Sequence, residues 1–426
     1  MTLPVETGDA PSGSSGLQID ARPLTRRLLV ALDEAGVRCC LLRPTAGGGD
    51  VDMLVDTADQ AAAVAVMARH RLLRLAAYGR GTHAFYLGLD RSTGSWVEFD
   101  LVTELTFGRH CEIRTAAAAA CLARRHRQDG IWVLGTDDEF WTLLLHCLLD
   151  KGGFAERHVW RLKTLAPLAS LDSPLVRAMP PRIDAAALLA HARAGRVQAL
   201  TAASLDIRRA WWRAQPATVA PAYLRAAALR LVERPLQAWS RRGPSVAVLG
   251  PDGAGKSTLA AGLESRFYFP VRRVYMGLWP SRDAADGPFR TAMRVAQRPF
   301  LAWWRYIGSL RHRALGRAVV FDRYVYDARL PPRGSLLWLK RLYFWVLSRA
   351  CPAPRMAVLL DAPGEVMYAR SGEYDPVHLE AERRHYVRLA TRIPRLVRVD
   401  ADRPPDEVLR DAVSHLWEYY RRRAGR

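Results

Sequence analysis

The apolar and polar positions follow a different pattern in the two halves of the chain. In the C-terminal half, short apolar runs alternate with segments of helical spacing, which is typical of a parallel sheet with helices on its faces. The first run, at 245–249, precedes a helix that has Leu259, Leu263 and Phe267 on one face. We predict further strands at four places in this half: 272–275, 318–321, 356–360 and 396–399.

The N-terminal half has a mixed pattern. An amphipathic helix at 21–35 ends at Gly36, and strands are predicted at 37–42, from Asp50 onward and at 95–102. From residue 136 onward the sequence predicts mainly helices, and the first of them begins with a capping box at Thr136. We interpret His146 in this first helix as a core residue, because no cysteine or histidine stands near it at metal-binding spacing.

These patterns predict an α/β protein in several parts. The expected division is a disordered leader at 1–18, an α+β domain at 19–135, a helical connector at 136–242 and a parallel-sheet domain at 243–426. The leader is polar and lacks the apolar core of a signal peptide, and no run reaches transmembrane length. We therefore expect a cytoplasmic protein.

Composition adds two constraints. The formal net charge of +21 comes almost wholly from arginine and would attract phosphates on nucleotides, nucleic acid or anionic lipid, although an arginine-rich solvated surface has the same composition. None of the six cysteines forms a CxxC pair. Buried thiols in a reducing compartment fit this pattern better than a disulfide framework or a zinc site.

The loop after the first C-terminal strand carries the strongest chemical signal. Gly250, Gly255, Lys256 and Ser257 match the P-loop pattern, and strand, glycine loop and helix follow in the required order. Such a loop turns its backbone N–H groups inward around phosphates at the positive end of a helix. Lys256 can then reach the outer phosphates, and the Ser257 hydroxyl can bind Mg²⁺.

The strand at 318–321 ends on Asp322, which we predict to bind Mg²⁺ directly or through water. ATPases of the motor and transport classes usually follow this aspartate with a glutamate that activates water. Here the next residue is Arg323, which can clamp a phosphate but cannot act as a base. This favours phosphoryl transfer to a phosphorylated acceptor over hydrolysis.

With these residues the C-terminal part resembles the thymidylate kinase family, over roughly 243–426. The resemblance implies a P-loop fold in which Lys256, Asp322, Arg323 and the lid residue Arg370 are catalytic. Arg383 and Arg384 are further lid candidates. It also implies that ATP is bound by Gly250, Asp252, Gly253, Ala254, Gly255, Lys256, Ser257 and Thr258, with Asp252 facing the acceptor.

The acceptor is less determined. Where the family carries an Arg-Glu-Pro-Gly-Gly segment, this chain has an unrelated stretch around Arg282, so a nucleotide other than dTMP, a phosphorylated sugar or a lipid intermediate stays open. Trp303 and Trp304 could stack on a base, but tryptophans at helical spacing favour a core position. The segment 336–348 could lie on a membrane surface, but its composition favours a buried helix.

Asp50 and Asp52 form a second signal, because alternate residues of a strand share a face. Asp100, on the strand at 95–102, could join them and complete a two-metal site. The pattern resembles nucleotidyltransferase-fold domains, which implies metal binding by Asp50, Asp52 and Asp100. The family's upstream Gly-Ser pair is absent, since Arg43 and its neighbours stand there, and this argues against triphosphate binding.

Together these observations predict a kinase that uses ATP and Mg²⁺, with Ser257 and Asp322 as metal ligands, acting most simply on a nucleoside monophosphate. The alternatives are an ATP-binding regulatory or nucleic-acid-associated ATPase, and a nucleotidyltransferase with a fused kinase domain. A homodimer, nucleic acid and a membrane surface stay open as partners.

Overall fold

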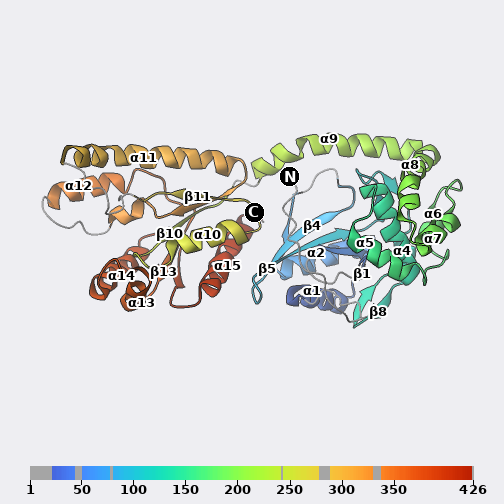
Figure 1. Ribbon diagram of the computed structural model, residues 1–426, viewed down its shortest axis with the longest axis horizontal. Helices are drawn as coiled ribbons and strands as arrows, with labels where there is room; N and C mark the ends of the chain where they lie inside the picture. The colour runs from blue at the N-terminus through green and yellow to red at the C-terminus, as the bar shows by residue number, and fades with distance from the viewer. Residues whose placement is uncertain are drawn as a thin grey trace. The chain divides into compact units, whose positions relative to one another are not determined.

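The computed structural model describes residues 22–43, 50–76, 80–240, 243–277, 288–329 and 337–424. The predicted leader, the loop at 44–49 and the stretch around Arg282 lie outside these residues. The chain divides into two compact units (Figure 1). The first contains the described residues up to 75, those from 80 to 88, and Val97–Ala227; the second contains Ala76, Leu89–Trp96 and the described residues from 228 onward.

The first unit is built on a seven-stranded mixed sheet with the order β3-β4-β5-β2-β1-β9-β8. Central strand β2 runs parallel to β5 and antiparallel to β1. The three strands predicted in this half of the chain are found here as β1, β2 and β5. The strands span β1 Cys39–Leu41, β2 Val51–Val55, β3 Leu73–Arg74, β4 Ala84–Asp90, β5 Ser95–Val102, β8 His126–Gln128 and β9 Ile131–Val133; β6 Thr106–Phe107 and β7 Ile113–Arg114 form a separate pair.

Both faces of this sheet are buried, and successive residues of its central strands serve opposite faces. Cys39 and Leu41 of β1 pack with helices α1 (Pro23–Glu34) and α2 (Gln60–Arg69). Cys40 of the same strand belongs to a second hydrophobic cluster on the other face. Since side chains alternate along a strand, the register of each strand fixes which of its polar side chains lie on this second face.

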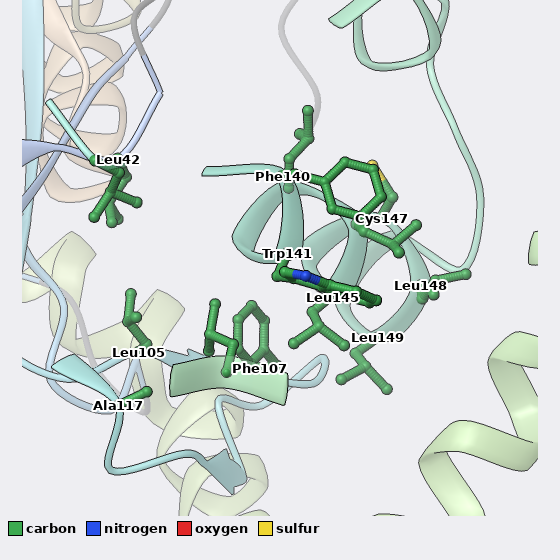
Figure 2. Close-up of a cluster of buried hydrophobic side chains, with 14 of the residues drawn as sticks. Leu42, Leu105, Phe107, Ala117, Phe140, Trp141, Leu145, Cys147, Leu148 and Leu149 are labelled. Carbon is green, nitrogen blue, oxygen red and sulfur yellow. The ribbon is translucent and has the colours of Figure 1, made fainter. Parts of the chain in front are cut away.

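The second cluster is supplied mainly by helices. Figure 2 shows Trp141 and Leu145 of α4 (Thr136–Leu145) with Leu149 of the following π-helical turn η2 (His146–Lys151). The predicted helical segment adds residues to the same cluster, so its described part to Ala227 shares the core of the first unit. Its helices are α5 Glu156–Leu165, α6 Pro174–Ala178, α7 Ala185–Arg193, α8 Val197–Ala214 and α9 Pro216–Ser240; α3 Ala118–Ala123 precedes them.

The second unit contains a five-stranded sheet in which every neighbouring pair is parallel. Its order is β11-β12-β10-β13-β14, so the first strand in sequence is the central one. All five strands predicted in this half of the chain are present. They span β10 Ser245–Leu249, β11 Val271–Tyr275, β12 Ala318–Asp322, β13 Met356–Asp361 and β14 Leu396–Asp400.

Helices cover both faces of this parallel sheet. On one face α11, α12 and α14 share a hydrophobic cluster with Ala247, Phe321 and Leu359 of the central strands. Helices α10 and α15 pack against each other and against the strands on the other face (Figure 1). The helices are α10 Lys256–Arg266, α11 Pro288–Ala314, α12 Leu337–Leu347, α13 Gly364–Ser371, α14 Pro376–Ala390 and α15 Pro405–Ala424, with a short turn η3 Val325–Arg329.

The six cysteines all lie in the described part of the chain, and each is a free thiol, as predicted. Five of the six are buried. Burial raises the pKa of Cys39, Cys121, Cys147 and Cys351 to about 12. Among the described helices, none combines the length and apolar character needed to cross a lipid bilayer.

Candidate functional site

The glycine loop lies at the carboxyl end of the central strand β10, and α10 begins directly after it. Gly253 and Gly255 have φ values of 81° and 91°, a backbone region that residues with a side chain seldom adopt. A Cβ atom at Gly253 would lie 2.3 Å from the carbonyl oxygen of Met367. The loop is therefore curled tightly against α13, and Gly253 requires glycine for two separate reasons.

Lys256, the first residue of α10, folds back over this loop. Its Nζ donates hydrogen bonds to the carbonyl oxygen of Pro251 at 2.6 Å and to Oδ1 of Asp252 at 3.2 Å. The side chain is 7% exposed. Burial and then the charge of Arg323 lower the pKa of Lys256, against the opposing effect of Asp252. The loop thus holds one buried amine close to its own backbone.

Ser257 and Asp322 meet beside the loop. The Ser257 hydroxyl donates a hydrogen bond to Oδ2 of Asp322 at 3.0 Å. The sheet causes this meeting, because β12 lies next to β10 and Asp322 pairs in register with Val248. In a nucleotide complex, Mg²⁺ is bound by only one or two protein oxygens, and phosphate oxygens and water complete its coordination. A hydroxyl and a carboxylate at this place are suitable protein ligands. Ser257 and Asp322 could hold such an ion.

Arg323 follows Asp322 with a φ of 66°. Its guanidinium pairs with the carboxylate of Asp252, and its Nη1 lies 4.0 Å from Oδ2 of Asp327. Burial would lower the pKa of Arg323, but the two carboxylates raise it. Burial would likewise raise the pKa of Asp252, whereas Lys256 and Arg323 together lower it. Two cations therefore share the Asp252 carboxylate at the edge of the loop.

The structure adds two residues that the sequence interpretation missed. The Tyr386 hydroxyl donates a hydrogen bond to Oδ1 of Asp327 at 2.9 Å, and both side chains are buried. Oδ2 of Asp327 has no hydrogen bond, and burial raises the pKa of this carboxyl to about 6. The i, i+4 spacing from Arg323 could have pointed to Asp327. No sequence signal links Tyr386 to it, because the two lie 59 positions apart.

The predicted lid arginines contact protein groups. Arg370 donates to the carbonyl oxygen of Ala401 at 2.9 Å. Arg383 donates from Nε to Oδ1 of Asp361 at 2.6 Å, and Asp361 also pairs with Arg398. Arg384 is largely exposed and lies 3.5 Å from Glu380. Phosphate contacts by these arginines stay predictions.

In the first unit, the predicted carboxylates do come together. Asp52 and Asp100 pair in register on adjacent parallel strands, on the face that carries the second cluster. Arg43 pairs with Asp52, and Nδ1 of His83 lies 2.7 Å from Oδ2 of Asp100. Partial desolvation, then Asp52 and Asp100, raise the pKa of Asp50.

Two basic side chains thus pair with two of these three carboxylates, Arg43 with Asp52 and His83 with Asp100. Burial alone would lower the pKa of His83, but hydrogen bonds to Asp100 and Cys111 raise it to about 10. Among the described residues of the chain, no three histidine, cysteine or acidic side chains form a group that could hold a metal ion. Sequence reasoning missed both His83 and the pairing of Arg43, because neither stands near the Asp-x-Asp pattern at a diagnostic spacing.

Two predicted core positions are wrong and a third is correct in part. His146 is partly buried, and its Nδ1 lies 2.6 Å from Oδ2 of Asp150, one helical turn away. Trp303 and Trp304 of α11 are 48% and 64% exposed. The helix predicted as buried at 336–348, found as α12, is buried on one side only: Leu347 is in the core, whereas Trp338 and Trp345 are exposed. Helical periodicity of apolar residues is the same for a core-facing and a solvent-facing stripe, which explains these errors.

Comparison with protein-family models and with curated proteins finds no match to the chain.

Proposed function

We propose that the second unit is a P-loop kinase that transfers the γ-phosphoryl group of ATP to a phosphorylated acceptor, most simply a nucleoside monophosphate. The observation that carries the proposal is the hydrogen bond between Ser257 and Asp322, beside the buried amine of Lys256. A hydroxyl, a carboxylate and an amine at the start of a helix are the groups that hold Mg²⁺ and the outer phosphates of ATP.

The strand order supports a ligand site at this position. Strand β10 is central, and the chain first builds β11 and β12 on one side of it and then β13 and β14 on the other. In open parallel sheets, ligands bind outside the carboxyl ends of the strands where the chain changes direction in this way. The glycine loop directly follows the carboxyl end of β10, at this change of direction.

In the proposed reaction the protein positions and neutralises charge. The N–H groups of the loop and the N-terminus of α10 would bind the phosphates of ATP. Lys256 would exchange its bonds to Pro251 and Asp252 for contacts with the β- and γ-phosphates. Mg²⁺, held by Ser257 and Asp322, would neutralise charge that develops during transfer.

Arg323 would bind the acceptor. Its guanidinium already pairs with the carboxylate of Asp252, so Arg323 is placed to bind an anionic group next to the loop. A phosphate that displaced Asp252 would receive a bidentate contact, and Asp252 would then be free to accept hydrogen bonds from acceptor hydroxyls. An arginine fixed at this position can align an acceptor phosphate but cannot activate water, which favours transfer over hydrolysis.

A screen for phosphoryl transfer tests the proposal. Purified protein with Mg-ATP is assayed against nucleoside monophosphates, sugar phosphates and lipid phosphates for ADP and phosphorylated product. We expect product with one acceptor class, and a loss of about a hundredfold or more in Lys256→Ala and in Arg323→Ala. Arg209→Ala, an exposed arginine of the first unit, is the matched control and should keep full activity. ADP without phosphorylated product would support the ATPase alternative.

A second candidate function, nucleotidyl transfer by the first unit, is favoured by one observation only: Asp52 and Asp100 stand side by side in the sheet. Incubation of the protein with labelled nucleoside triphosphates and acceptor candidates tests it. Transfer of a nucleotide that Asp50→Ala and Asp100→Asn abolish, and that Lys256→Ala leaves intact, would establish this activity. Absence of transfer in wild-type protein would reject it.

A further inference from the structure

Helices α11 and α12 of the second unit expose an unusual number of large apolar side chains. Four tryptophans stand in solvent: Trp303, Trp304, Trp338 and Trp345 are 48%, 64%, 69% and 55% exposed. Phe300, Leu301, Ile307, Leu310, Leu342 and Val346 are exposed on the same two helices. Single exposed apolar residues are ordinary, but many large apolar side chains exposed on two neighbouring helices indicate an interaction surface.

The exposed residues form one face. Phe300, Trp304 and Ile307 follow each other at helical spacing on α11, as do Trp338 and Trp345 on α12. The two helices contact each other, and both pack their inner sides into the hydrophobic cluster on one face of the parallel sheet. The exposed apolar side chains therefore lie on the sides of the two helices that are turned away from this cluster, and α12 lies next to one end of α11 (Figure 1). We call the exposed apolar side chains of these two helices the tryptophan face.

The charged residues of these two helices have a single sign. From Pro288 to Arg317 the sequence contains seven arginines and no acidic residue, and the stretch 337–355 contains Lys340, Arg341, Arg349 and Arg355 and again no acidic residue. Arg311 and Arg341 are exposed, and the Arg349 guanidinium lies 4.2 Å from the ring centroid of Trp345. The apolar side chains of both helices thus occur in sequence together with basic residues and with no carboxylate of the same helix.

We propose that the tryptophan face docks on the surface of an anionic lipid bilayer, with α11 and α12 lying in the plane of the interface. Helices that bind this way have tryptophan, phenylalanine and leucine on one side and arginine or lysine beside them. Tryptophan rings suit the boundary between headgroups and acyl chains, and long basic side chains reach the anionic headgroups.

A second copy of the chain fits this face less well. A symmetric dimer through the tryptophan face would place arginines of one copy against arginines of the other, because a two-fold interface presents the same patch twice. No carboxylate of either helix is present to pair with them. Like charges facing each other are unfavourable, whereas the headgroups of an anionic bilayer are complementary.

Vesicle flotation tests the proposal with the full chain. We expect the protein to float with vesicles of phosphatidylcholine and phosphatidylglycerol and not with phosphatidylcholine alone. Trp304→Ser combined with Trp345→Ser should lower the partition coefficient by about tenfold or more, because two large apolar side chains no longer insert. Arg341→Glu should lower it by about fivefold or more.

The controls use exposed residues elsewhere in the chain. Trp160→Ser removes a tryptophan that is 63% exposed on α5 of the first unit, and Arg225→Glu reverses an exposed charge on α9; both should bind vesicles like wild type. Equal binding of the Trp304, Trp345 double variant and wild type would overturn the proposal. A second result would also overturn it: the wild type does not bind vesicles but self-associates in sedimentation velocity, and the double variant loses this self-association.

The docking surface does not depend on the proposed kinase activity. Lys256→Ala should bind anionic vesicles as well as wild type does, since Lys256 lies at the glycine loop and not on the tryptophan face. Vesicle binding and phosphoryl transfer can therefore fail separately. If the acceptor proves to be a lipid phosphate, vesicles that contain it should accelerate transfer only when the tryptophan face is intact.

Discussion

At the scale of single residues, the charges around Arg323 explain why its position is fixed. Arg323 is held in a left-handed backbone conformation between two carboxylates, of which Asp327 is buried and retained by Tyr386. A buried carboxylate is costly unless its charge is compensated. The ion pair at 4.0 Å compensates it only in part, which agrees with a pKa raised to about 6.

Asp327→Asn should therefore stabilise the second unit more at high pH than at low pH. Burial raises the pKa of Asp327 to about 6 in the folded protein, whereas the carboxyl of an unfolded aspartate has a pKa of about 3.8, so folding favours the protonated form. Ionisation destabilises the fold as pH rises through this window, and asparagine does not ionise. The difference in unfolding free energy between variant and wild type should grow by about 1–1.5 kcal/mol from pH 5 to pH 8. Urea denaturation at both pH values measures it.

Asp361→Asn is the matched control. Burial would raise the pKa of Asp361, but hydrogen bonds from Arg383 and Arg398 lower it. Its carboxylate thus stabilises the fold above the unfolded value of about 3.8, and this contribution is lost only below it. The effect of Asp361→Asn should stay constant from pH 5 to pH 8. A parallel pH dependence in both variants would contradict the role assigned to Asp327.

At the scale of the elements, strands were easier to predict than exposed helix faces. The three central strands of the parallel sheet, β10, β12 and β13, are short apolar runs because both of their faces are covered. A run such as 356–360 is too short for a typical helix and was therefore predicted as a strand. The glycine loop was predictable for a different reason, because its strand, loop and helix are contiguous in sequence. The Asp327–Tyr386 pair and the His83–Asp100 pair were not, because they join residues from separate elements.

Periodicity also could not tell which side of α11 and α12 faces the core. Both sides of these helices carry aromatic residues, with Tyr306 and Tyr343 against the cluster and Trp304 and Trp338 in solvent. Only the position of the sheet decides between them. The site around Asp52 and Asp100 was predicted in part: the two strands and their shared face were predicted, but the basic partners Arg43 and His83 were not.

Two glycines in the second unit should respond in opposite ways to substitution by alanine. Gly253→Ala should destabilise it by about 1–3 kcal/mol, because the φ of 81° is unfavourable and the new Cβ would meet the Met367 carbonyl. Gly308→Ala should stabilise it by about 0.5–1 kcal/mol, since Gly308 lies inside α11 with open space around it. Thermal or urea unfolding compares the two. Equal effects would contradict the described loop geometry.

At the scale of the whole molecule, each unit has its own sheet and its own core, and the chemistry divides accordingly. The second unit combines the glycine loop with the tryptophan face, whereas the first unit holds paired carboxylates neutralised by Arg43 and His83. The net charge of +21 is spread over the chain. Long-range attraction of phosphates is therefore expected of the protein as a whole, and specificity is expected at the loop.

Mg-ATP should raise the unfolding temperature of wild-type protein and leave that of Lys256→Ala unchanged. A ligand that binds only the folded state stabilises it by about 2.7 kcal/mol at one hundred times its dissociation constant. Removal of the metal with a chelator should reduce the shift, because Ser257 and Asp322 would then lose the ion between them and the phosphates. Differential scanning calorimetry measures the effect. An undiminished shift in Lys256→Ala would place ATP elsewhere.

The central claim is that the γ-phosphoryl group goes to an acceptor and not to water, and a single-turnover experiment tests it most directly. Enzyme in excess over γ-labelled ATP, with Mg²⁺ and the acceptor found in the screen, is quenched and the label is followed to its product. We predict one labelled acceptor for each ADP formed, with both products lost in Lys256→Ala. Recovery of the label as free phosphate, with the acceptor unchanged, would contradict the account and identify the second unit as an ATPase.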